Sequence, residues 1–137
     1  IKEYSFLEDK IQVIPYLPHN EVVKEYKKAA CLLLLLNDSE IAKGHIPGKL
    51  FEYLASGISI LALGPVDSDV SKIIEENSAG TTIPQNNKDA MKKSIAEFYR
   101  KYKENIQDQQ SENIKEYSRE NLTKKLAGFF NEVAQKS

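Results

Sequence analysis

The sequence has little of what several classes of protein depend on. Its single cysteine, Cys31, excludes a disulfide within the chain and a metal site built from cysteines. The longest apolar run, from Ala29 to Leu36, is far shorter than the roughly 20 residues of a membrane-spanning helix. We also expect no signal peptide before the first folded segment. We therefore expect a soluble, cytoplasmic protein with no membrane span.

Neither sign of charge is in excess. The chain has 19 lysines and arginines against 20 aspartates and glutamates. This balance gives no overall attraction to nucleic acid or to an anionic membrane. We expect neither as a partner, and any anion-binding site must be local.

The start of the chain does not look like the start of a complete protein. It has no initiator methionine, and residues 1–4 (IKEY) resemble the middle of a helix. At 137 residues the chain fits one domain. We therefore expect a fragment of a longer protein.

Short apolar runs alternate with amphipathic stretches, which indicates an α/β protein whose parallel strands are joined by covering helices. The run at Cys31 to Leu36 is apolar without alternation, as in a central strand buried on both faces. The strands that we expect are about four, at residues 11–14, 31–36, 58–63 and 79–84.

The expected helices have recognisable starts and stops. Asn20 is placed to cap a first helix, Pro47 to occupy the first turn of a second, and Gly57 to end it. A third helix is expected to begin near Ser68, which explains the Asp67-Ser68-Asp69 run better than a metal site does. From about residue 87 the pattern predicts two or more amphipathic helices.

Charged and glycine residues gather where the strand at 31–36 leads into the second helix. Ligands of open parallel sheets collect at the carboxyl ends of the strands, where a helix presents free N–H groups and its positive dipole end. Gly44 and Gly48 allow close approach, and Lys43, His45 and Lys49 supply positive or protonatable groups. The pattern predicts an anion site suited to a diphosphate.

Glu52 lies on the first turns of the same helix. A carboxylate is favoured there by the helix dipole, and it can accept two hydrogen bonds from a ribose diol. Tyr16, in the loop after the first strand, is placed to flank a nucleotide base, although packing is the commoner role of such a tyrosine. His19 is more simply a turn residue than an acid or base.

Residues 47–57 (PGKLFEYLASG) followed by 60–63 (ILAL) resemble the donor-site motif of family 4 glycosyltransferases of the GT-B fold, of bacterial type. Residues 15–21 (PYLPHNE) are similar to the loop after the third strand of their C-terminal domain, and 30–36 to the fourth strand. The resemblance covers about residues 9–84. It implies a partial Rossmann-like nucleotide-sugar-binding domain at 1–86, with C-terminal helices at 87–137 packing on it.

The resemblance also implies roles for individual residues. In the family, the glutamate matching Glu52 binds the donor ribose, the backbone before it contacts diphosphate, and the preceding loop touches the transferred sugar. The donor-binding residues that we expect are Tyr16, His45, Ile46, Pro47, Gly48, Lys49, Leu50 and Glu52. Enzymes of this fold commonly use no metal, so no cofactor is expected.

The sequence departs from the family in two ways. Many members place a second glutamate eight residues before the ribose-binding one, and that position is Gly44 here, with Glu40 the nearest upstream acid and His45 or Lys43 possible substitutes. The first two strands of the domain and the acceptor-binding N-terminal domain, which often carries a catalytic histidine, have no counterpart. We therefore expect the catalytic residue to lie in the missing N-terminal domain. The expected partners of this chain are the nucleotide-sugar donor and that domain. We also expect the chain to be inactive alone.

The function implied is transfer of a sugar from a nucleoside-diphosphate sugar to an acceptor hydroxyl. One alternative is a nucleotide-sugar epimerase of related fold, but the loop is poor in the carboxylates that such chemistry needs. Another is a noncatalytic interaction domain on a flavodoxin-like sheet. Its phosphoacceptor aspartate would follow a strand, where this chain has only Asn37-Asp38 beside a basic loop.

The family's strand order, 3-2-1-4-5-6, creates a gap in this chain. The strand at 11–14 would be the third, separated from 31–36 by the two that are missing. Buried backbone groups cannot stay unpaired, so either the strand at 11–14 pairs directly with 32–36, or a second copy supplies the edge. We expect the first, because a right-handed crossover through the helix at 20–30 is short and allowed.

Overall fold

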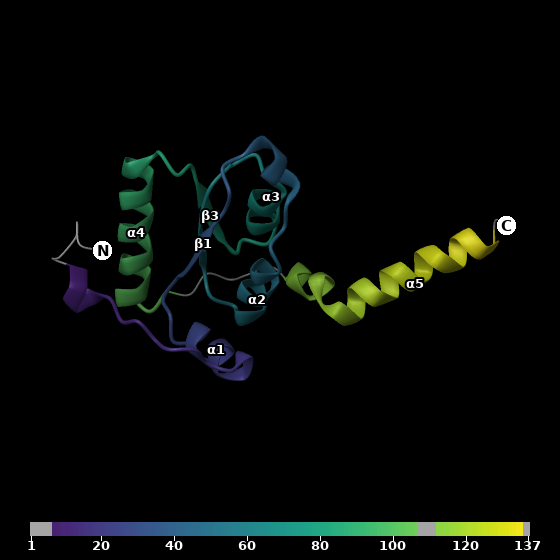
Figure 1. The fold of residues 1–137 in the computed structure, drawn as a ribbon, viewed down its shortest axis with the longest axis horizontal. Coiled ribbons are helices and arrows are strands. Elements are labelled where there is room, and N and C mark those ends of the chain that lie inside the picture. Colours follow the sequence, from purple (N-terminus) through teal and green to yellow (C-terminus); the bar gives the residue numbers. More distant parts are fainter. Residues whose placement is uncertain (1–6, 107–111, 136–137) are drawn as a thin grey trace.

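The computed structural model describes residues 7–106 and 112–135. It has an α/β fold in which a parallel sheet lies between helices (Figure 1). The strands are β1 (Leu32–Leu35), β2 (Ile60–Leu63) and β3 (Gly80–Ile83). The helices are α1 (His19–Tyr26), α2 (Gly48–Ser56), α3 (Asp69–Glu76), α4 (Lys88–Lys103) and α5 (Arg119–Gln135), with 3-10 turns η2 (Glu40–Gly44) and η3 (Glu112–Tyr117).

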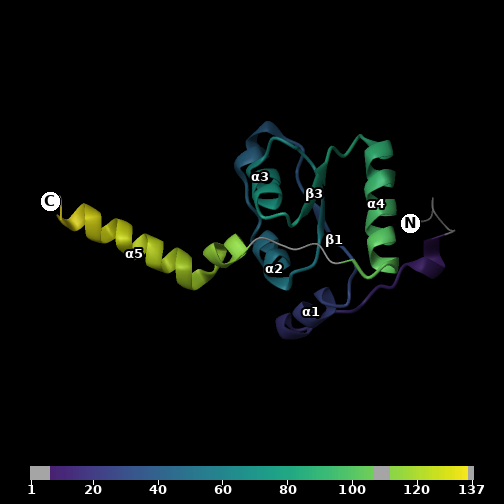
Figure 2. The same ribbon diagram turned by 180° about the vertical axis from the view of Figure 1, so that it is seen from behind.

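Within the described residues the sheet has three strands in the order β1-β2-β3, all parallel. Leu32 pairs in register with Ile60, and Ile60 with Gly80. Figures 1 and 2 agree that α2 and α3, which connect the strands, lie on one side of the sheet and α4 on the other. The carboxyl ends of β1, β2 and β3 therefore meet at a single edge.

The core lies between the sheet and the connecting helices. Leu50 of α2, Ile60 of β2, and Val70 and Ile74 of α3 are almost completely buried. β1 contributes Leu34, because its side chains alternate between buried and exposed along the strand. This layer holds the start of α2 against the ends of β1 and β2.

Several local signals act as the sequence predicts. Gly57 ends α2 in the left-handed conformation, at φ 75°, which glycine adopts without the strain of a Cβ. Ser68 caps α3 by accepting a hydrogen bond from the Ser71 N–H. Two helix starts differ from the prediction: the N-cap of α1 is Pro18, two residues before Asn20, and Pro47 is the N-cap of α2 rather than a residue of its first turn.

The strand predicted at residues 11–14 is wrong. These residues have no regular structure and are exposed, Val13 by 81%. Pro15 and Pro18 follow at once and cannot donate to a ladder.

In residues 7–106 and 112–135 the sheet has three strands rather than the expected four or so, and the predicted pairing of 11–14 with 32–36 does not occur. β1 is an edge strand, paired within the described residues only with β2. The prediction that it is buried on both faces is also wrong, since Leu33 is 52% and Leu35 68% exposed. The reason is the position of α4, which packs along β3 and leaves the same face of β1 open.

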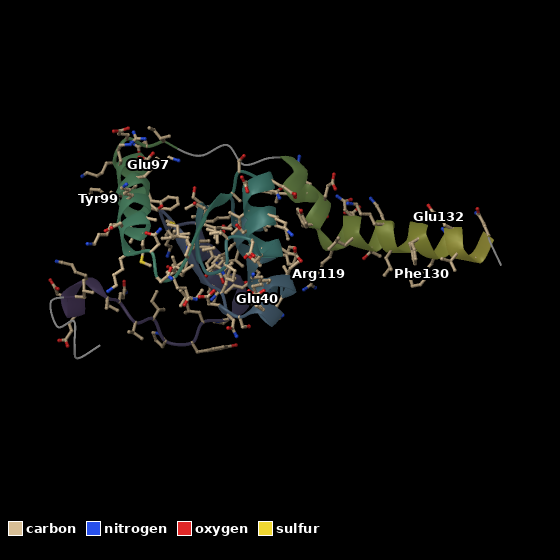
Figure 3. The ribbon with its side chains drawn as sticks, turned by 90° about the horizontal axis from the view of Figure 1, so that it is seen from above. Glu40, Glu97, Tyr99, Arg119, Phe130 and Glu132 are labelled. Atoms are coloured by element: carbon tan, nitrogen blue, oxygen red, sulfur yellow. The ribbon has the colours of Figure 1, made fainter. Side chains whose placement is uncertain are left out.

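The C-terminal residues pack unequally. α4 lies against β3, and η3 lies against α2, where the Tyr117 ring is 5.9 Å from that of Phe51. α5 packs on η3 and has no buried residue. It projects away from the rest of the chain, with Phe130 and Glu132 far from the sheet (Figure 3). None of the helices described is long and apolar enough to cross a membrane.

Candidate functional site

A small cavity of about 150 Å³ lies at the carboxyl edge of the sheet. It is lined by residues that follow β1, by the loop before α2 and by the start of α3: Leu35, Leu36, Asn37, His45, Pro47, Pro65, Ser68 and Val70. Two of the predicted donor-binding residues, His45 and Pro47, are thus brought to the ends of the strands.

The N-terminus of α2 opens beside this cavity. The first N–H groups of a helix have no intrahelical partner. Ser68 and Asn87 satisfy such groups in α3 and α4, but Pro47, at the N-cap of α2, makes no side-chain cap. The N–H of Leu50 donates a hydrogen bond to the carbonyl oxygen of Pro47 at 3.0 Å. The N–H groups of Gly48 and Lys49 remain available at the positive end of the helix dipole.

The space in front of Gly48 is open. A Cβ built there would meet no atom within 4 Å. The side chains of His45 and Lys49 are exposed nearby, with the Lys49 ammonium 5.6 Å from the centre of the Tyr53 ring. The helix dipole and the two N–H groups favour an anion at this end of α2, and the exposed His45 side chain lines the cavity beside it. Leu50 is fully buried, so only its backbone is available.

Lys43 is engaged elsewhere. Its ammonium lies 2.7 Å from a carboxylate oxygen of Asp67 and 2.8 Å from one of Glu40. These hydrogen bonds raise the pKa of Lys43, and the same bond from Lys43 lowers the pKa of Asp67. With two carboxylates around it, Lys43 ties η2 to the loop after β2 and is a poor phosphate ligand.

Glu52 faces α1 rather than the cavity. It is partly buried, and one carboxylate oxygen accepts a hydrogen bond from the Tyr26 hydroxyl at 3.3 Å. Burial raises the pKa of the Tyr26 phenol, and the negative charge of Glu52 raises it further. The Tyr26 ring packs edge-on against Tyr53, at 5.1 Å between centres. Glu52 follows Gly48 by about 6 Å along the helix axis.

The remaining predicted residues are spread out. Ile46 is partly buried and packs against the core. Tyr16 is 93% exposed, in the segment before α1. Gly44 faces an acid: a Cβ placed on it would lie 3.9 Å from a carboxylate oxygen of Asp69.

Sequence reasoning missed Tyr26 and Asp67 as neighbours of the site. Tyr26 lies on α1, which packs against α2, and Asp67 stands beside the serine that caps α3. The signal for Asp67 was available in the order of the elements, because loops that follow adjacent parallel strands meet at one edge. Asp67 follows β2 just as Lys43 follows β1.

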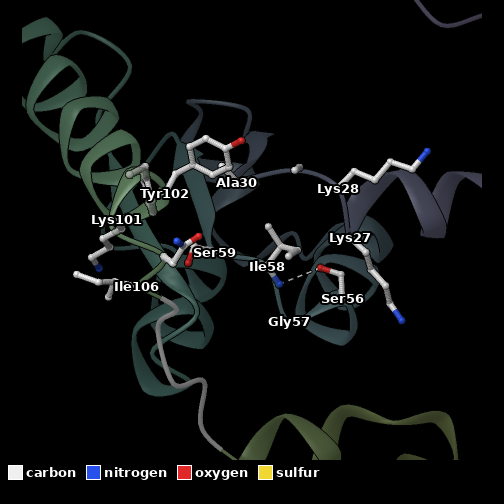
Figure 4. A pocket seen from close by; sticks show the side chains of 13 residues that line it. Lys27, Lys28, Ala30, Ser56, Gly57, Ile58, Ser59, Lys101, Tyr102 and Ile106 are labelled. Atoms are coloured by element: carbon white, nitrogen blue, oxygen red, sulfur yellow. Dashed lines mark hydrogen bonds between the residues drawn. The ribbon is translucent and has the colours of Figure 1, made fainter.

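A larger hollow, of about 520 Å³, lies at the opposite end of the sheet, where the strands begin. In Figure 4, Lys27 and Lys28 lie on one side of the hollow and Tyr102 on the other, and the two lysine side chains extend away from Tyr102. α2 and α4 end nearby, and helix C-termini carry partial negative charge that lysines balance. Its basic residues are explained by these helix ends, so we do not place an anion there.

No group of three or more histidine, cysteine, aspartate or glutamate side chains that could hold a metal ion occurs in residues 7–106 and 112–135. Residues 2–121 match the family model for glycosyl transferases group 1. Comparisons with curated proteins and with solved structures gave no match.

Proposed function

The chain belongs to the group 1 glycosyl transferases, and from this premise we propose that it binds the donor, a nucleoside-diphosphate sugar, whose sugar is transferred to an acceptor hydroxyl. The diphosphate lies at the start of α2, on the N–H groups of Gly48 and Lys49. Glu52 takes the ribose, with His45 and Ile46 beside the transferred sugar. Tyr16 flanks the base when the segment before α1 folds over it.

The observation that carries this proposal is the uncapped N-terminus of α2 at the carboxyl edge of a parallel sheet. The helix dipole, two free N–H groups and the open space before Gly48 favour an anion at this point. The same donors would stabilise the diphosphate as it leaves with the negative charge of the broken glycosidic bond. No metal is required for this step, and the acid or base acting on the acceptor comes from outside this chain.

Many family members have a second glutamate where this chain has Gly44. We assign the role of that glutamate, contact with the transferred sugar, to Asp69. Its carboxylate stands 3.9 Å from where a side chain on Gly44 would begin, and Lys72 holds it at 2.8 Å. A carboxylate in this place can accept hydrogen bonds from sugar hydroxyls. Asp69→Asn, which keeps the shape and removes the charge, should weaken binding of the nucleotide sugar but not of the free nucleoside diphosphate.

The experiment is a titration of the 137-residue chain with UDP, GDP, ADP and inorganic pyrophosphate. The chemical shifts of the backbone amides, measured by NMR, report binding. The amides of Gly48 and Lys49 should move first and farthest with every diphosphate that binds. The amide of Lys101, at the amino-edge hollow, is the internal control and should stay in place.

Shifts centred on Lys101 with none at Gly48 would contradict the site. Absence of binding by all four ligands would contradict the donor-binding function of this chain. An epimerase would be recognised by a changed sugar in the recovered nucleotide sugar, when the longer enzyme is incubated with donor and no acceptor.

A further inference from the structure

The cavity at the carboxyl edge of the sheet is small for a ligand site. Its volume is about 150 Å³, whereas pockets that hold a whole small molecule begin at roughly 300 Å³. Pro47, the N-cap of α2, lines it, so it lies beside the N–H groups of Gly48 and Lys49. With a donor diphosphate on those groups, the cavity has room for one substituent of the attached sugar.

The walls of the cavity are mainly apolar. Of the eight described residues that line it, five are apolar: Leu35, Leu36, Pro47, Pro65 and Val70. Val70 is almost completely buried. A sugar hydroxyl enclosed by these side chains would lose its bonds to water without a replacement, which is unfavourable. The substituent that enters must therefore present an apolar surface.

Two polar groups on these walls already hold partners within the chain. The hydroxyl of Ser68 donates a hydrogen bond to the carbonyl oxygen of Pro65 at 2.8 Å and accepts one from the N–H of Ser71 at 3.2 Å. The carbonyl oxygen of Leu36 accepts a hydrogen bond from the side-chain amide of Gln85 at 2.6 Å. Both groups therefore add little to the polarity that a ligand would meet.

The side chains of Asn37 and His45 are available to a ligand. Asn37 follows β1 and His45 precedes α2, and both line the cavity and are exposed. Among the described residues neither side chain has a hydrogen-bond partner. The asparagine amide can donate and accept, and a neutral imidazole has one donor and one acceptor nitrogen. These groups match the N–H and C=O of an amide.

We propose that the sugar of the donor is a 2-acetamido sugar, such as N-acetylglucosamine, whose acetamido group occupies this cavity. The inference rests on the proposed function, because it takes the diphosphate to lie at the start of α2. The diphosphate is attached to C1 of the sugar, so the substituent on C2 is the one nearest that helix end. Its methyl group packs against Val70 and Pro65, and its amide meets Asn37 and His45.

Other substituents match the cavity less well. The methyl group of a 6-deoxy sugar would fill the apolar part and leave Asn37 and His45 without a partner. A plain hydroxyl on C2 would leave the apolar space empty and forfeit its packing contacts. Asp69 lies between the lining residues Ser68 and Val70 in sequence, and its half-exposed carboxylate remains for ring hydroxyls outside the cavity.

The test uses two matched pairs of ligands with the 137-residue chain. One pair is UDP-N-acetylglucosamine and UDP-glucose, and the other is the 1-phosphates of the same two sugars, which lack the base. NMR of backbone amides and valine methyl groups reports binding. The N-acetylated member of each pair should bind roughly tenfold more tightly, because it adds a buried methyl group and an amide hydrogen bond. It alone should move the signals of Ser68 and Val70, whereas both members move Gly48.

Three variants locate the acetamido group. Val70→Leu adds one methylene where the acetamido methyl group lies, so the preference for the N-acetylated ligands should disappear. Val66→Leu is the matched control, because Val66 is exposed and lies outside the cavity lining, and it should keep the preference. Asn37→Ala, at an exposed side chain, should reduce the preference roughly two- to tenfold without a change in the core. The shift of the Gly48 amide with inorganic pyrophosphate checks that each variant is folded.

Equal binding of both members of each pair, with shifts at Gly48, would overturn the inference and leave the proposed function standing. So would a preference that survives both Val70→Leu and Asn37→Ala, which would place the acetamido group elsewhere. Binding of GDP or ADP at Gly48, with no binding of N-acetylglucosamine 1-phosphate, would also overturn the inference alone. Absence of any shift at Gly48 with all these ligands and with pyrophosphate would contradict the proposed function, and the inference with it.

Discussion

The hydroxyl of Tyr26 donates a hydrogen bond to the carboxylate of Glu52, across the contact between α1 and α2. A ligand that uses Glu52 must therefore share this carboxylate with Tyr26 or displace it. Since a carboxylate has about four acceptor positions, sharing is possible without loss of the tyrosine bond.

The first prediction concerns the Tyr26 phenol, whose pKa should lie above the ordinary value of tyrosine. Burial is the largest single cause of the raised pKa, and the charge and hydrogen bond of Glu52 follow it, so Glu52→Gln should lower the pKa of Tyr26 only part of the way. Carbon-13 NMR of labelled tyrosine rings follows Tyr26 separately from the other tyrosines. A pKa that does not respond to Glu52→Gln would show that the two side chains do not meet in solution.

The second prediction concerns the role of Glu52 in donor binding. Glu52→Ala should weaken donor binding roughly ten- to a hundredfold, because a hydrogen bond to a charged group contributes about 1.5–3 kcal/mol. Isothermal titration with the nucleoside diphosphate measures this change.

Two controls separate ribose binding from damage to the α1–α2 contact. Tyr26→Phe removes the tyrosine bond and keeps the carboxylate, so it should bind the donor almost normally. Glu76→Ala, at the exposed end of α3, should have no effect. Equal losses from Tyr26→Phe and Glu52→Ala would assign Glu52 to packing.

The third prediction concerns Asp67 and pH. The hydrogen bond from Lys43 holds the pKa of Asp67 below its usual range, so the tie between them is complete above the unfolded pKa of about 3.9 and is lost as the pH falls through the lower, folded value. Side-chain carbon-13 shifts of Asp67 should report this low midpoint. Lys43→Met should return it toward the ordinary value, and an unchanged midpoint would argue against the ion pair.

The fourth prediction compares two glycines. Gly80 has φ 151°, and a Cβ there would lie 1.9 Å from the Ile60 carbonyl oxygen of β2. Gly80→Ala should lower the free energy of unfolding by about 1–3 kcal/mol, because the backbone of the sheet must shift. Gly48→Ala, which meets open space at the first turn of α2, should leave stability unchanged or slightly higher. Urea denaturation measures both, and a Gly80→Ala chain as stable as Gly48→Ala would contradict the predicted clash.

The location of the candidate site was predictable from the sequence to the extent that it depends on the order of strand, loop and helix along the chain. The loop at 43–47 follows a strand and precedes α2, so His45, Pro47 and Gly48 reach the carboxyl edge as soon as the strand is parallel. The partners of these residues were not predictable. Lys43 meets Asp67 across 24 positions of sequence, and only the packing of β1 against β2 brings the two loops together.

The sequence by itself determined the end of α2 at Gly57 and the start of α3 at Ser68, because capping bonds and left-handed turns form between residues that are close in the chain. The tertiary structure alone decided which strand is central. The apolar run at Leu32–Leu35 fits a strand buried on both faces as well as one at an edge, because its side chains alone do not specify what lies beside them. Its exposure depends on where α4 packs and on whether residues 11–14 reach it, and both depend on contacts between distant parts of the chain.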